Sequence, residues 1–183
     1  MRNIFEDFLA TMPVSKDIIM KYKDKIPSEL MNIWKQYGFG SFMSGYLRII
    51  NPDEYRDVLD ETYARAAIAL PVLSTAMGDI IVWEENRYLR IIQYRYGIFT
   101  GISAGFDFFW EDVANGELNS LFDIKTYICA SNRLGIPNCD ECFGYVPLLG
   151  IGGGETIENL QKVDMKTHLQ IITQFMGKVG ECE

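Results

Sequence analysis

The segment LPVLSTAMGDIIVWEENRYLRIIQYRYGIFTGI, residues 70–102, decides the fold class of this chain. Its β-branched and aromatic residues fall in short runs that turn-forming residues separate. Glu85-Asn86 and residues 95–97 lie where two hairpin turns are expected. The segment therefore predicts an antiparallel meander of about three or four strands. The expected strands cover residues 71–76, 79–84, 88–94 and 98–102.

Helical patterns lie on both sides of this meander. Ser120 with Asp123 can cap one helix after it and Asp164 another, and Gly135 and Gly177 can end them. The fold class that we expect is α+β, with N-terminal helices, a central antiparallel sheet of about 4–6 strands, and C-terminal helices. Before the meander, helices are predicted over residues 3–12, 28–37 and 51–62, and a short strand over residues 46–50.

The chain has 183 residues, of which 48% are hydrophobic, so it is long enough to bury a core. Its 17 Lys and Arg against 25 Asp and Glu give a net charge of −8. This charge repels phosphate backbones, so it disfavours direct nucleic-acid binding and favours a basic partner, although it could equally serve solubility. The N-terminal sequence MRNIFEDFLATMP lacks the features of a signal peptide, and no apolar run reaches membrane-spanning length. We therefore expect a cytoplasmic protein without a membrane partner.

The chain contains 4 cysteines, at positions 129, 139, 142 and 182. Cys139 and Cys142 form a CxxC pair, but a structural zinc site usually needs a second such pair. The intervening Asp140-Glu141 would also raise the pKa of the thiols, which disfavours a reactive thiolate. We expect ordinary reduced cysteines and no metal, while a metal or redox role of Cys139 and Cys142 stays open.

His168 and the glycine run at residues 152–154 each allow a functional interpretation as well as a structural one. His168, the single histidine, lies near the apolar boundary of the last predicted helix and could act as a general base. The sequence places no partner acid for it, so a structural role is favoured. Gly152-Gly153-Gly154 could cradle a phosphate, but Glu155 follows and would repel one. A tight turn whose backbone passes close to another element is the favoured interpretation of these glycines.

Acidic residues gather on one side of the helix predicted over residues 51–62. Such an acidic ridge can bind a basic groove through complementary charge, or it can be an ordinary solvated face. Asp140 and Glu141 add negative charge near the C-terminal glycines. The acidic ridge consists of Asp53, Glu54, Asp57, Asp60 and Glu61.

The segment DECFGYVPLLGIGG, residues 140–153, resembles the DECYGFVPALALGG signature of the C-terminal domain of type VI secretion DNase-immunity proteins. The resemblance continues through ENLQKV at residues 158–163 and HLQIITQ at residues 168–174. The N-terminal part is similar to the GAD-like domain that commonly precedes this family, on Trp34 and the YGFG segment at residues 37–40. Together the two resemblances cover nearly the whole chain.

This resemblance implies a GAD-like region over residues 1–104 and an immunity C-terminal region over residues 105–183, packed as one globular unit. It implies an immunity protein that binds a cognate secreted toxin and occludes its active site, with a nuclease as the leading partner class. No reaction, cofactor or metal is expected, and the acidic ridge with Asp140 and Glu141 supplies the candidate toxin-binding residues. The motif positions expected to be structural are Gly144, Pro147, Gly152, Gly153 and His168.

Two other functions compete with this one. A hydrolase would need His168 in a pocket and within hydrogen-bond reach of a carboxylate. A regulatory or scaffold module of the SMI1/KNR4 kind would share the fold and bind endogenous partners without a toxin, because similar W-x-x-Y-G-x-G patterns occur in that wider family.

Overall fold

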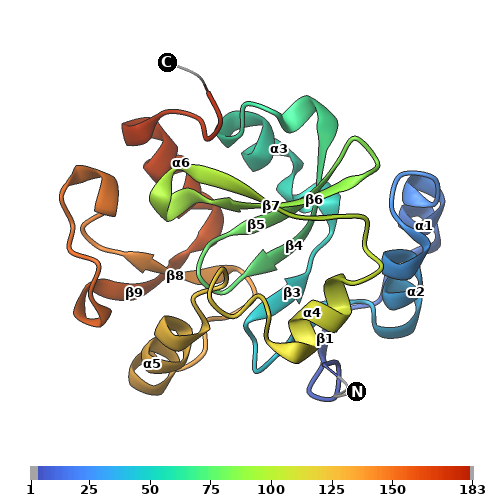
Figure 1. The fold of residues 1–183 in the computed structure, drawn as a ribbon, viewed down its shortest axis with the longest axis horizontal. Coiled ribbons are helices and arrows are strands. Elements are labelled where there is room, and N and C mark those ends of the chain that lie inside the picture. The colour runs from blue at the N-terminus through green and yellow to red at the C-terminus, as the bar shows by residue number, and fades with distance from the viewer. Residues whose placement is uncertain (1–3, 182–183) are drawn as a thin grey trace.

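The computed structural model describes residues 4–181, and a seven-stranded sheet lies at its centre (Figure 1). The strands follow one another in chain order across the sheet, and each pairs antiparallel with the next. This arrangement is a continuous meander, so no strand has to cross over another. The strands are β1 (Leu9–Met12), β2 (Phe39–Phe42), β3 (Leu47–Ile49), β4 (Ala69–Thr75), β5 (Ile80–Glu84), β6 (Tyr88–Gln93) and β7 (Ile98–Ala104).

Helices cover both faces of the sheet, and a separate two-stranded hairpin lies beside it next to the last helix (Figure 1). None of the helices within residues 4–181 has the length and apolar character needed to cross a membrane. The helices are α1 (Lys16–Tyr22), α2 (Ser28–Tyr37), α3 (Pro52–Thr62), α4 (Phe109–Asn115), α5 (Ile124–Leu134) and α6 (Met165–Met176). The hairpin is formed by β8 (Glu141–Tyr145) and β9 (Leu160–Asp164), and short 3-10 turns are η1 (Ala66–Ile68), η2 (Tyr94–Tyr96), η3 (Leu149–Ile151) and η4 (Ile157–Asn159).

The predicted meander is confirmed as strands β4 to β7. Glu85 and Asn86 both have positive φ, +53° and +52°, which is the geometry of a tight two-residue hairpin turn. β5 is buried along its whole length because it has a core on each side. Ile81 belongs to the cluster on one face, while Ile80 and Val82 belong to the cluster on the other.

The expectation of about 4–6 strands is too small, because residues 9–12 and 39–42 form strands that the sequence pattern does not predict. The helix predicted over residues 3–12 is wrong. Residue 3 lies outside the described residues, and residues 9–12 form the edge strand β1, in which Leu9 pairs with Ser41 and Ala10 with Gly40. A Cβ at Gly40 would lie 2.3 Å from the Leu9 carbonyl oxygen, so glycine permits this pairing. Pairing across the sheet therefore outweighs the helical spacing of the apolar residues.

The predicted separation of helices from the sheet is also only partly correct. α3 lies between β3 and β4 in the chain, so it interrupts the sheet sequence rather than preceding it. Its predicted start is confirmed: the Asn51 side chain accepts a hydrogen bond from the Asp53 amide at 3.1 Å, and Pro52 occupies the first turn. α2, α5 and α6 also lie where the sequence predicts helices, and glycines follow all three.

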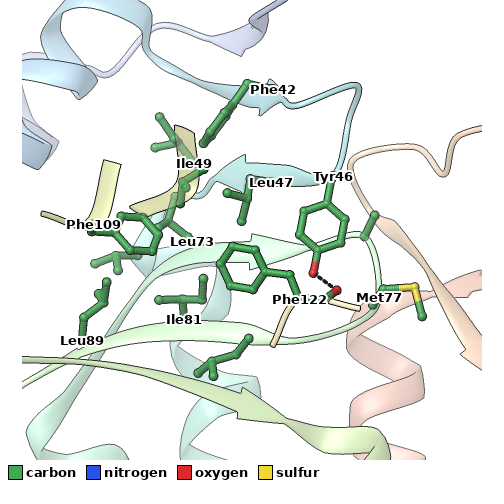
Figure 2. Close-up of a cluster of buried hydrophobic side chains, with 14 of the residues drawn as sticks. Phe42, Tyr46, Leu47, Ile49, Leu73, Met77, Ile81, Leu89, Phe109 and Phe122 are labelled. Atoms are coloured by element: carbon green, nitrogen blue, oxygen red, sulfur yellow. Dashed lines mark hydrogen bonds between the residues drawn. The ribbon is translucent and has the colours of Figure 1, made fainter. Parts of the chain in front are cut away.

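Two buried clusters fill the two faces of the sheet. Figure 2 shows part of the first, in which Phe42 and Leu73 of the sheet lie near Phe109 and Phe122 from the later part of the chain. The hydroxyl of the fully buried Tyr46 donates a hydrogen bond to the Phe122 carbonyl at 2.5 Å. The second cluster lies under α3 and α6. It includes Tyr55, Val58, Leu59, Leu169 and Ile172.

Hydrogen bonds between the central sheet and the later part of the chain hold the β8–β9 hairpin against the sheet. The buried guanidinium of Arg48 donates to the carbonyls of Cys139 and Glu141, at 3.2 and 2.5 Å. The Phe143 amide donates to the Ala76 carbonyl at 2.7 Å. One cluster thus contains side chains from both sides of residue 104. The boundary at that residue stays a prediction.

Candidate interaction surfaces

The acidic ridge forms the exposed face of α3. Its five carboxylates lie opposite the buried side chains of the same helix, as the spacing of about 3.6 residues per turn requires. The structure thus brings Asp53, Glu54, Asp57, Asp60 and Glu61 together on one helix, all of them exposed.

Two of these carboxylates form ion pairs within the chain. Asp53 accepts hydrogen bonds from Lys21 Nζ and from the Tyr22 hydroxyl, both at 2.5 Å. Asp60 forms a two-pronged ion pair with Arg56, which lies four residues earlier on the same helix. Exposed pairs of this kind contribute roughly 0–1 kcal/mol to stability. Their consequence here is that the ridge presents less net negative charge than its sequence suggests.

The other three ridge carboxylates differ in what they contact. Glu61 accepts a hydrogen bond from Gln170 Nε2 at 2.6 Å, which joins α3 to α6. Glu54 has a weaker contact with Asn51 Nδ2 at 3.4 Å. The carboxylate of Asp57 makes no hydrogen bond or ion pair with any residue from 4 to 181, so its charge is available to a partner.

Asp140 and Glu141 lie at a second acidic position, where the hairpin meets the start of α6. The Asp140 carbonyl accepts from the Met165 amide at 2.8 Å, and the Glu141 carboxylate accepts from the Asn138 amide at 2.9 Å. In the hairpin ladder Glu141 lies directly opposite Asp164, and two like charges in this arrangement repel each other. The start of α6 is therefore an acidic site in its own right.

Cys139 and Cys142 of the CxxC pair differ in their exposure to solvent. Cys139 and Cys129 are exposed, whereas Cys142 is fully buried and burial raises its pKa to about 12. A thiol in this state is protonated and unreactive at neutral pH. No disulfide and no group of three or more metal-ligating side chains occurs among these residues, and Cys182 lies outside them.

His168 packs against the hairpin rather than against an acid. It is 8% exposed, and a Cβ at Gly144 would lie 2.4 Å from its Nε2 atom. Burial lowers the pKa of His168, so the ring is neutral near pH 7. Its ring makes no hydrogen bond or ion pair with any of the described residues. The arrangement that a hydrolase needs, a histidine bonded to a carboxylate, is therefore not formed by this side chain here.

The glycine run forms a turn that folds back on the chain. Gly152 adopts a φ of +95°, a conformation that favours glycine. A Cβ at Gly153 would lie 2.1 Å from the Pro147 carbonyl oxygen. Pro147 follows a cis peptide bond from Val146. Residues 145–151 lie against α6, where a Cβ at Gly150 would lie 2.3 Å from the Met176 sulfur.

Between this loop and α6 lies an apolar groove of about 370 Å³, a feature that the sequence pattern does not predict. His168 and Val163 contribute to its lining. Its large apolar side chains are unusually exposed: 63% for Phe175, 55% for Ile151 and 38% for Ile171. Single exposed apolar residues are common on proteins, but several around one groove mark a place where another surface binds.

The sequence indicates one side of this groove, the exposed apolar face of α6, but not the loop that completes it. Ile171 and Phe175 are four residues apart, so they lie on one face of α6. That face is different from the buried one, which Met165, Leu169 and Ile172 form. A helix with two apolar faces packs one of them in the core and leaves the other for a partner.

Comparison with known proteins relates both halves of the chain to described families. Residues 2–95 match the family model of the GAD-like domain, and residues 103–176 match the model of "T6SS immunity protein Tdi1, C-terminal". No curated protein matches the chain. Among solved structures, Atu4351 from Agrobacterium tumefaciens is similar with a TM-score of 0.73 and 19% sequence identity, over 93% of this chain and 86% of that one. At 19% identity, this similarity shows a shared fold alone.

Proposed function

The chain belongs to the GAD-like domain family, and because its C-terminal part matches a type VI secretion immunity protein, we propose that it binds and neutralises a cognate bacterial toxin. The match over residues 103–176 is the observation that carries this proposal. That segment includes β8, β9 and α6, and therefore both the acidic start of α6 and the apolar groove.

The charge of the chain supports a basic toxin, and a nuclease is the leading class. The net charge is −8, and exposed carboxylates lie along α3 and at the start of α6. A nuclease presents a basic groove to its substrate, so an acidic inhibitor is attracted to it and associates faster. We propose that the bound chain covers the active site of the toxin in the cytoplasm of the producing cell.

A stoichiometric blocker, rather than an enzyme, is the role that we assign to this chain. His168 is neutral, buried and without a carboxylate partner within the described residues, so it does not support general base catalysis. Neutralisation by binding needs only a rigid complementary surface and a slow dissociation rate.

The test is co-expression of this chain with the toxin encoded beside its gene. We expect growth to be restored, and we expect a purified one-to-one complex in which toxin activity stops at equimolar inhibitor. A catalytically inactive toxin serves as the control, because it should form the same complex without any effect on growth. If no neighbouring product binds, or if binding leaves the toxin active, immunity to that protein is wrong. The regulatory module of the SMI1/KNR4 kind then becomes the better explanation.

A further inference from the structure

We propose that the apolar groove between residues 145–151 and α6 is the anchor point for the toxin, and that it takes a large apolar side chain with lysine or arginine beside it. This inference rests on the proposed function and assigns a binding site to it. The acidic ridge then has a supporting role in attraction, and the groove has the main role in affinity.

The groove leaves exposed a set of side chains that a folded chain normally buries. Phe175 and Ile171 of α6 face it from one side, and Val146 and Ile151 of the loop from the other. Burial of one such side chain contributes about 1.5–3 kcal/mol. Because these side chains stay exposed, folding does not gain this free energy. A partner that covers them gains this contribution on binding.

The walls of the groove are already fixed in the free protein. On one side Gly144 lies directly against His168, and a Cβ at Gly150 would lie 2.3 Å from the Met176 sulfur, so the loop and α6 are in close contact. On the other side Gly153 lies against the Pro147 carbonyl. A site that does not have to be ordered on binding loses less entropy, which favours affinity.

The charge at one end of the groove indicates what kind of side chains flank the apolar anchor. Asp164 lines the groove where α6 starts, and Glu141 lies opposite it in the ladder. Hydrogen bonds from Thr167 and, to a lesser degree, the charge of Lys166 lower the pKa of Asp164, so this carboxyl is ionised at neutral pH. The other nearby lysine, Lys162, donates to the Ile136 carbonyl, so two carboxylates face one lysine at this end. The acidic end therefore favours Lys or Arg next to the apolar side chain.

The groove is too small to form a whole interface, and α6 lies between it and the acidic ridge on α3. A stable complex covers about 800 Å² on each partner, and a few anchor side chains in well-packed pockets contribute most of its affinity. The Glu61–Gln170 hydrogen bond places α3 directly beside α6. A basic toxin can thus contact the ridge while one of its apolar side chains enters the groove.

The experiment measures the dissociation constant between this chain and a catalytically inactive form of the toxin encoded beside its gene. The variants are F175D and I171D in the groove. Matched controls come from the same residue types at similar exposure elsewhere: F108D for Phe175, at 68% against 63%, and I68D for Ile171, at 43% against 38%. We expect each groove variant to weaken binding by about 30-fold or more and each control by less than about 3-fold. Thermal unfolding of every variant shows that the fold is kept.

The outcomes separate this inference from the proposed function. If the wild-type chain does not bind the toxin, the function itself is wrong. If it binds, and F175D and I171D bind equally well, only the groove assignment is wrong. If the free chain forms dimers that F175D dissociates, the groove belongs to a second copy of this chain and the assignment is also wrong.

Discussion

The central sheet and the C-terminal groove differ in which side chains they bury and which they expose to solvent. In the sheet and in the turns at its strand ends even charged groups are buried: Asp79, just before β5, is 0% exposed, and Arg95, in η2, is 7% exposed. Arg95 Nη1 lies 2.5 Å from Asp79 Oδ1. Glu84 is also fully buried and accepts hydrogen bonds from Tyr63 and Arg90. In the groove, by contrast, large apolar side chains remain in contact with solvent.

This difference separates the residues that stabilise the fold from those available to a partner. A buried charge is costly unless a partner compensates it, so these buried pairs must stay intact for the chain to fold. An exposed apolar side chain contributes little to folding, so it can be changed with little loss of stability. We therefore expect substitutions in the two regions to affect different measurements.

The largest effect is expected for Asp79, in the turn between β4 and β5. D79A leaves the guanidinium of Arg95 buried without its carboxylate, and this should lower the free energy of unfolding by about 3–5 kcal/mol in urea denaturation. F175D in the groove should change the same quantity by less than about 0.5 kcal/mol. Equal losses for the two variants would show that the groove is part of the folding core.

The next largest effect is expected in the glycine turn that shapes the groove. G153A places a methyl group against the Pro147 carbonyl and should cost about 1–3 kcal/mol. G154A is the matched control, because the nearest atom to its Cβ is the end of the flexible Asn159 side chain, at 3.2 Å. Thermal melts of both variants check this, and a stable G153A protein would contradict the close approach.

A smaller effect is expected from the acidic ridge, and it concerns the rate of association. D57K should slow toxin binding several-fold at low salt and have little effect at high salt, because screening removes the attraction between exposed charges. E111K is the control, with the same change of charge on α4, which packs with the cluster on the opposite face of the sheet. If both variants slow binding equally, only the net charge matters and the ridge has no special role.

The smallest effect is expected from His168 and depends on pH. Burial lowers the pKa of His168 in the folded state, so the unfolded chain binds its proton first as the pH falls below about 6.5. The stability that the neutral ring contributes is complete above that pH and decreases below it. H168Q should therefore lose less stability than the wild type between about pH 6.5 and 5 in urea unfolding. Parallel curves for the two proteins would contradict a buried neutral histidine.

The parts of the fold with strong local signals are predictable from the sequence. The turn at Glu85-Asn86 and the caps at Asn51 and Asp164 each identify an element through residues that lie next to it. β1 is not predictable in this way, because its pairing depends on Gly40, which is distant in the chain. The groove is not predictable either, since it exists only after residues 145–151 pack against α6. For the same reason the ion pairs that weaken the acidic ridge, such as Lys21 with Asp53, are visible only in the fold.

The most direct test of this account is hydrogen–deuterium exchange of the chain with and without the inactive toxin encoded beside its gene. Binding should protect the backbone amides of residues 145–151 and of α6 most strongly, with weaker protection along α3. Protection confined to another surface, such as the exposed edge strand β1, would contradict the groove as the anchor point. No protection anywhere in the chain would contradict immunity to that toxin.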